Sequence, residues 1–226
     1  MSRFSWLIIC LFCLGGCTGI PRMVPLYPLE TILEKPDCRQ PFAKNQWQFV
    51  HTIRMETGRK ASFFSGVITV DPAAESVRCT LLTLEGLVLF DARLTRGKPE
   101  VIKAVPPFDR PALATGILTD VGLIFLSPAG PPETGRTGSG DIVCRFGAPQ
   151  QGIVEVVPAR DRSDRSWQIR KYDENGRVVR EVVTGTSGRW EGAETLFIPD
   201  TFTLTATGSR GYRLHFRCLS STRIGL

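Results

Sequence analysis

The chain has 226 residues, of which 42% are hydrophobic, and its 28 basic and 22 acidic residues give a formal net charge of +6. The basic excess is mild and dispersed. Segment 160–165 alternates in sign, and no run combines basic with aromatic residues as single-strand nucleic-acid sites do. Nucleic acid is therefore excluded as an expected partner, and the length and apolar content fit one domain with a single sizeable core.

The N-terminus is typical of an exported lipoprotein. Arg3 precedes an apolar run of about 11 residues, which is too short to span a bilayer because a spanning helix needs ~20. The run ends in "LGGC" (14–17), which resembles a bacterial lipobox. We expect a signal peptide at 1–16 and a lipid on Cys17, with a signal peptide that is not lipidated as the alternative. Because Thr18 and not aspartate follows, we expect an outer-membrane protein that faces the periplasm.

Four cysteines remain beyond the lipidation site. Export places them in an oxidising compartment, where two disulfides in any of three connectivities are expected, with buried free thiols as the alternative. No pair has the spacing of zinc ligands, so no metal is expected. The disulfide candidates are Cys38, Cys79, Cys144 and Cys218.

Residues 17–45 have the composition of a tether. They contain five prolines and show no sustained apolar period. We therefore expect a lipidated N-terminus and Pro-rich tether at 17–45 and a folded domain at 46–226.

Strand patterns begin directly after this segment. Trp47, Phe49, His51 and Ile53 alternate with more polar residues, as expected for a half-buried strand. Short turns connect the further candidate strands, and this spacing predicts hairpins and an antiparallel sheet. The further strands are expected at 62–71, 76–84, 87–95, 100–105, 141–146, 151–158, 166–172, 177–184, 201–206 and 212–219.

One amphipathic helix interrupts the strands. We expect it at 110–126, with Asp109 as its cap and Pro111 in its first turn. Residues 128–140 have the composition of an exposed loop. The predicted apolar stripe of the helix consists of Leu113, Ile117, Leu118, Val121, Ile124 and Phe125.

No reactive constellation is evident in the sequence. The glycine-rich "GRTGSG" (135–140) follows the predicted helix and precedes a strand, whereas a phosphate loop lies between a strand and a helix. His51 is expected in the core or a cavity wall, and His215 between two arginines is expected in solvent. We expect no catalytic residues and no cofactor, and a binding protein is favoured over an esterase-like enzyme.

Three segments resemble the LolA/LolB superfamily of lipoprotein carriers and, more closely, a LolB-like family of outer-membrane lipoproteins of unknown function. The resemblance covers roughly residues 45–220. The segments are "GVITVDPAAESVRCTLLTLEGLVLFDARL" (66–94), "ALATGILTDVGLIFLSP" (112–128) and "IPDTFTLTATGSRGYRLHFRCLSS" (198–221).

This resemblance implies a mainly β fold, a half-open antiparallel β-barrel with a lid helix over an apolar cavity. It also implies that the chain binds acyl chains of lipids or lipoproteins. The alternative is a non-catalytic structural or assembly-partner lipoprotein that contacts other envelope proteins. The expected cavity residues are Trp47, Phe49, Ile53, Phe64, Ile68, Leu113, Ile117 and Val121.

Overall fold

The computed structural model describes residues 20–25, 37–39, 41–148, 152–158, 166–191, 196–208 and 211–224. The predicted signal peptide and the lipidation site Cys17 lie outside these residues. Most of the described chain forms one 13-stranded antiparallel sheet, in the order β1-β7-β8-β9-β10-β11-β14-β15-β2-β3-β4-β5-β6. A separate two-stranded sheet contains β12 and β13.

The first seven strands are β1 (Val24–Pro25), β2 (Trp47–Thr57), β3 (Lys60–Asp71), β4 (Ser76–Leu82), β5 (Val88–Thr95), β6 (Lys98–Ala104) and β7 (Glu133–Arg136). The next four are β8 (Ile142–Ala148), β9 (Gly152–Val157), β10 (Gln168–Tyr172) and β11 (Val178–Thr184). The last four are β12 (Gly188–Glu191), β13 (Leu196–Pro199), β14 (Thr201–Ala206) and β15 (Tyr212–Arg223). The helix is α2 (Pro111–Phe125).

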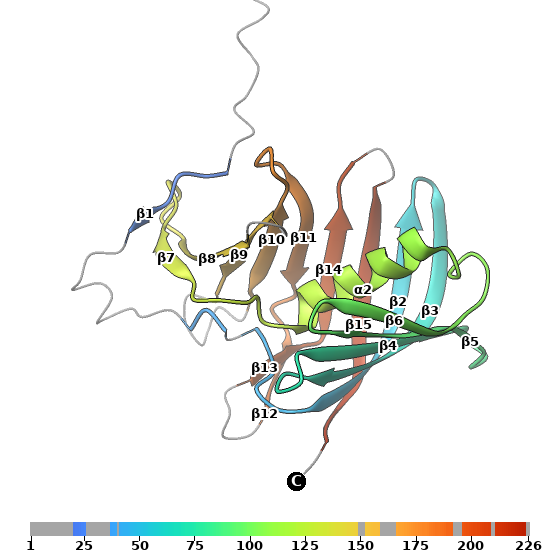
Figure 1. Ribbon diagram of the computed structural model, residues 1–226. Coiled ribbons are helices and arrows are strands. Elements are labelled where there is room, and N and C mark those ends of the chain that lie inside the picture. The colour runs from blue at the N-terminus through green and yellow to red at the C-terminus, as the bar shows by residue number, and fades with distance from the viewer. Residues whose placement is uncertain are drawn as a thin grey trace, which may run out of the picture.

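The large sheet is bent but does not close. Its edge strands are β1 and β6, which are not paired with each other. Figure 1 shows α2 crossing β14, β15 and β2, with β4 to β6 folded beneath the helix. The helix also contacts β4, β5 and β6. The predicted half-open antiparallel barrel with a lid helix is confirmed.

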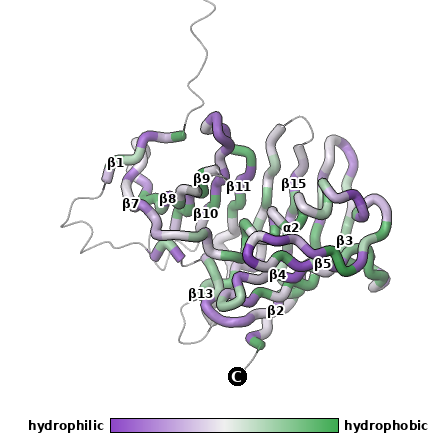
Figure 2. Tube along the Cα trace, viewed as in Figure 1, coloured by the Kyte–Doolittle hydropathy of each residue, from purple (hydrophilic) through white to green (hydrophobic). Residues whose placement is uncertain are grey.

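Alternation of side chains builds the core on the concave face of the sheet. Hydrophobic and hydrophilic residues alternate along the strands (Figure 2), and in β2 every second residue from Trp47 to Ile53 is buried. One cross-strand row places Phe202, Phe216, Ile53 and Phe64 side by side on four neighbouring strands. Gly66 leaves room for this row, because a Cβ there would lie 2.7 Å from Cδ1 of Ile53.

Helix α2 buries its apolar side against this core. Leu118 and Ile124 are buried, and Gly122 allows a close approach to β5, since a Cβ there would lie 2.9 Å from Leu94. The predicted helix cap was wrong. The N-cap is Arg110 and no side chain caps the helix, so Asp109 does not have that role. No helix in the described part of the chain is long and apolar enough to cross a membrane.

Parts of the segment expected to be a tether are fixed to the sheet. Strand β1 pairs with β7, and a disulfide joins Cys38 to Cys144 on β8 with a Cα–Cα distance of 5.6 Å. Cys79 and Cys218 are free, so the expectation of two disulfides was wrong. Their strands, β4 and β15, are separated in the sheet by β2 and β3, so the two thiols cannot meet.

Two short strand pairs differ from the sequence expectations. Strand β7 lies within 128–140, which was expected to be a loop, and it pairs with β8 on one side and β1 on the other. The β12–β13 hairpin was not predicted at all. All four residues of β13 are buried, so the period-2 signal that marks a half-buried strand is missing there.

Candidate ligand cavity

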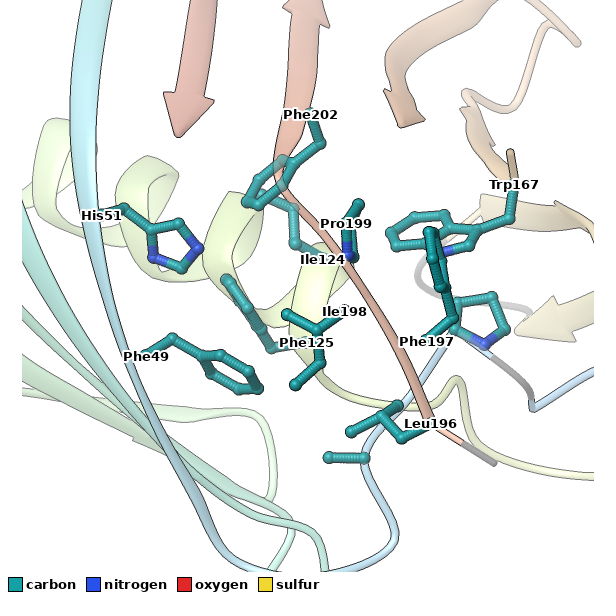
Figure 3. Close-up of a pocket in the computed structure, with 12 residues that line it drawn as sticks. Phe49, His51, Ile124, Phe125, Trp167, Leu196, Phe197, Ile198, Pro199 and Phe202 are labelled. Carbon is teal, nitrogen blue, oxygen red and sulfur yellow. The ribbon is translucent and has the colours of Figure 1, made fainter. Parts of the chain in front are cut away.

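An apolar cavity lies where α2, the concave face of the sheet and β13 meet. Its volume is about 40 Å³. Figure 3 shows its side chains converging from the sheet on one side and from β13 on the other. The lining residues are Pro41, Ala43, Phe49, His51, Ile124, Phe125, Trp167, Leu196, Phe197, Ile198, Pro199 and Phe202.

Six parts of the chain position these side chains. Strands β2 and β14 and Trp167, just before β10, supply the wall, the last turn of α2 supplies one cover, and β13 supplies a second cover. The sixth part is the segment just before β2, which contributes Pro41 and Ala43 and lies near the disulfide at Cys38. The described state therefore has apolar covers from α2 and β13 over a small cavity of about 40 Å³.

His51 is the one ionisable residue of this lining. Its side chain is 2% exposed and is surrounded by Phe49, Phe125, Phe202 and Phe216, with ring centroids 5.4 to 6.1 Å away. Burial lowers the pKa of His51 to about 4, so the imidazole is neutral near pH 7. Its Nδ1 has no hydrogen-bond partner. The expectation that His51 lies in the core or a cavity wall is confirmed.

Trp167 lies on the other side of the cavity and is held by its backbone. Its N–H donates to Oγ1 of Thr184 at 2.9 Å, and its carbonyl oxygen accepts from the Thr184 hydroxyl at 3.1 Å and from the Thr184 N–H at 3.2 Å. The side chain is 5% exposed, and its indole Nε1 has no hydrogen-bond partner in the part of the chain that the structure describes.

The sequence-predicted cavity residues are only partly brought together. Phe49 lines the cavity. Trp47, Ile53, Ile68 and Val121 are buried in the same core but outside the lining, and Phe64 and Ile117 pack against that core. Leu113 is 38% exposed, so the prediction that it faces the sheet was wrong. It lies one position before Ala114, which is the residue that faces inward in that turn.

The lining residues that the sequence analysis missed come mostly from segments without a clear period. Phe197 and its neighbours lie in β13, which is buried throughout, and Trp167 lies just before β10. Phe202 was open to prediction, because β14 alternates buried and less buried residues.

A buried ionic cluster holds the middle of α2 to the sheet. Asp120 of α2 accepts a hydrogen bond from Nε of Arg180 on β11 at 2.7 Å and another from the hydroxyl of Tyr212 on β15. Burial raises the pKa of Asp120, and these two donors oppose that effect. We call Asp120, Arg180 and Tyr212 the helix clamp.

A second cluster of the same composition lies on the opposite face of the sheet. Arg145 on β8 donates to Oε1 of Glu155 on β9 at 2.5 Å, and the Tyr172 hydroxyl donates to Oε2 at 2.6 Å. Arg145 also donates to the carbonyl oxygen of Pro21 at 2.7 Å. Burial raises the pKa of Tyr172 to about 12, and the hydrogen bond to Glu155 is the second largest cause. We call Glu155, Arg145 and Tyr172 the N-terminal clamp.

A wider hollow of about 520 Å³ opens over β14, β15, β2 and β3. Alternation places Arg54, His215 and Arg217 of its lining on the outer face of the sheet, opposite the core. His215, which was expected in solvent, is half-buried there and lies 3.4 Å from Glu56. Phe63 and Leu84 of the same lining are exposed.

The geometry supports binding and offers no reactive centre among the described residues. The cavity lining contains no Asp, Glu, Lys, Arg or Cys, and the described residues hold no group of His, Cys, Asp or Glu arranged to bind a metal ion. An enclosed surface of this kind favours apolar groups, because their removal from water is the main favourable term.

Comparison with known proteins gives a fold relationship. No family model matches the chain, and no curated protein matches it. A LolA superfamily protein from Nitrosomonas europaea superposes with a TM-score of 0.55 at 10% identity, covering 89% of this chain and 96% of that one. The chain has the LolA fold.

Two further solved structures are more distantly similar to this LolA-fold chain. A domain assigned to outer membrane lipoprotein sorting from Vibrio parahaemolyticus has a TM-score of 0.48 and 8% identity. A DUF1329 family protein from Desulfovibrio piger has a TM-score of 0.43 and 13% identity. Each match covers 80% of this chain and 87% of the other. The fold that the sequence resemblance implies is confirmed by the superposition on the Nitrosomonas europaea protein.

Proposed function

We propose that this chain is a lipoprotein of the outer membrane, anchored at Cys17 and facing the periplasm, that binds acyl chains of lipids or lipoproteins beneath α2. The observation that carries the proposal is the uncharged apolar cavity between the concave sheet face and two apolar covers. The LolA fold is consistent with such a role. Each CH₂ group of an acyl chain removed from water contributes about 0.8 kcal/mol to binding.

Binding requires the cavity to open. A volume of about 40 Å³ has room for water molecules but not for an acyl chain. The last turn of α2 and strand β13 are the covers that can move. Strand β13 pairs only with β12 among the described strands, and α2 is held to the sheet at its middle by the helix clamp. We infer that an entering chain displaces β13, the end of α2 or both.

The experiment is to fill the cavity with a side chain. Ala43 lines the cavity, and Ala43→Phe occupies the space that the ligand needs. Ala61→Phe adds the same ring at an exposed position of β3 and serves as the matched control. The full chain carrying Cys17→Ser is titrated with methyl decanoate against a bound apolar fluorophore. We expect Ala43→Phe to weaken binding at least tenfold and Ala61→Phe to bind as the parent does; equal binding by both would contradict the proposal.

The lipid anchor has its own test. Cys17→Ser should release the protein from the outer-membrane fraction, because a diacylated cysteine supplies the two chains that stable anchoring needs. Retention of Cys17→Ser in the membrane fraction after a high-salt wash would show that another contact holds the protein there.

The outer surface favours a second candidate, the assembly-partner lipoprotein. Phe63, Leu84 and Leu87 are each more than half exposed, and the first two line the outer hollow. Exposed apolar residues that lie together mark protein or membrane contact sites. This candidate gains if the parent chain binds no acyl compound while Phe63→Ser and Leu84→Ser abolish co-purification of an envelope protein.

A further inference from the structure

Two buried nitrogen atoms of cavity-lining residues, Nδ1 of His51 and Nε1 of Trp167, have no hydrogen-bond partner among the described residues. We propose that the ligand carries the carbonyl group of its acyl chain into this cavity, where the indole N–H of Trp167 donates a hydrogen bond to the carbonyl oxygen. This inference rests on the proposed function and adds to it a polar recognition element, which selects acyl esters and amides over plain hydrocarbons.

The position of Trp167 is fixed by the fold. Three backbone hydrogen bonds to Thr184, itself buried at the end of β11, hold the residue in place. The indole of this residue lines the cavity and lies beside Phe197 and Pro199, as Figure 3 shows. A preorganised donor of this kind gives specificity, because little ordering is needed when the ligand binds.

The indole nitrogen can only donate a hydrogen bond, so its partner must be an acceptor. Folded proteins leave few buried polar groups without a partner, because such a group has lost its bond to water without replacing it. A hydrocarbon chain at this place leaves the N–H unsatisfied, whereas a carbonyl oxygen satisfies it. Without a ligand, the buried indole N–H of Trp167 therefore lacks an acceptor among the described residues. The carbonyl oxygen of an ester or amide ligand supplies that acceptor.

The surroundings favour a neutral carbonyl over an ionised carboxylate. Among the described residues the lining has no Lys or Arg, and His51 is neutral near pH 7 because burial lowers its pKa to about 4. A carboxylate would be a buried charge that none of these described lining side chains can pair with, and burying an unpaired charge is strongly unfavourable. Figure 3 places His51 across the cavity from Trp167, so the two polar groups lie on opposite walls of an otherwise apolar site.

The test compares ligands within each variant, so that a change in stability does not affect the result. The full chain carrying Cys17→Ser is titrated with methyl decanoate and with decane against the same apolar fluorophore. In the parent, the ester should bind about five- to tenfold more tightly than the alkane, the usual contribution of one net hydrogen bond. Decanoate at pH 7.5 should bind more weakly than its methyl ester.

The decisive variant is Trp167→Phe, which keeps an aromatic ring and removes the donor. It should bring the ester-to-alkane affinity ratio close to one. Trp47→Phe is the matched control, because the Trp47 indole also lacks a partner but lies outside the lining; its ratio should stay at the parental value. A parental ratio near one, or a preference for the ester that survives Trp167→Phe, would overturn the inference and leave the proposed function standing. If neither compound binds the parent, the proposed function itself fails.

Discussion

The helix clamp and the N-terminal clamp use the same three groups, a buried carboxylate, an arginine and a tyrosine, on opposite faces of one sheet. They differ in which part of the chain carries the carboxylate. Glu155 belongs to a sheet strand and reaches the N-terminal segment only through Arg145 and the carbonyl of Pro21. Asp120 belongs to α2 itself. The first cluster is therefore part of the sheet, whereas the second can separate when the helix moves.

A further difference lies in what else holds each cover. The N-terminal segment is also attached by the pairing of β1 with β7 and by the disulfide between Cys38 and Cys144. The described part of α2 has no covalent link to the sheet and depends on apolar packing and on the helix clamp. The N-terminal segment is thus held by a disulfide and by strand pairing, which α2 lacks, so α2 is the cover that can move more easily.

The largest effect is expected from Arg145→Met. This change leaves the carboxylate of Glu155, which is fully buried, without its cation, and removing one partner of a buried ion pair costs about 3–5 kcal/mol. Urea unfolding at pH 7 measures it. Arg54→Met breaks the Arg54–Glu56 pair, which is largely exposed, and should change the free energy of unfolding by less than about 1 kcal/mol. Equal losses in the two variants would show that the N-terminal clamp is no more important than a surface ion pair.

A smaller loss is expected from Arg180→Met, about 2–3 kcal/mol. The carboxyl of Asp120 keeps the hydroxyl of Tyr212 as a donor, and its pKa, which burial already raises, allows it to take up a proton when the cation is lost. Hydrogen exchange should show faster opening of α2 in this variant, with β8 and β9 unchanged. If α2 and these strands lost protection together, the helix would not be a separately movable cover.

The smallest effect concerns His51. Its pKa is about 4 in the folded chain and about 6.5 when unfolded, so the unfolded state binds more protons between these values and stability falls as the pH drops through that window. Between pH 8 and pH 5 this amounts to roughly 2 kcal/mol. Well above pH 6.5 the group is neutral in both states and has no such effect.

The matching variant is His51→Phe, which keeps a ring in the aromatic surroundings and removes the titration. Between pH 8 and pH 5, the free energy of unfolding should fall by roughly 2 kcal/mol less in His51→Phe than in the parent protein. Parallel pH profiles would mean that His51 is solvated or charged in the folded protein, and the account of a neutral cavity would be wrong.

Much of the sheet could be predicted from the sequence, because half-buried strands show a period of two. The run from Trp47 to Ile53 and the pair of closing strands 201–206 and 212–219 are examples, and the structure contains strands at each of these places. The helix was predicted within one residue at each end for a similar reason, since its apolar residues recur at helical spacing.

The cavity was harder to predict, because its residues share no local pattern. Phe197 lies in a strand buried on both faces, and Trp167 acquires its place only through the pairing with Thr184. The clamps were missed for the same reason. Asp120 looks like the polar side of an amphipathic helix, and only the tertiary contact with Arg180 shows that it is buried.

Native mass spectrometry of the full chain carrying Cys17→Ser, produced by export and purified without detergent, tests acyl-chain binding directly. We expect a population of the folded protein to carry additional mass that corresponds to acyl-chain lipid, and we expect Ala43→Phe to lack it. A folded parent protein without any lipid adduct, or an adduct equally abundant in Ala43→Phe, would contradict the claim that acyl chains bind in the cavity beneath α2.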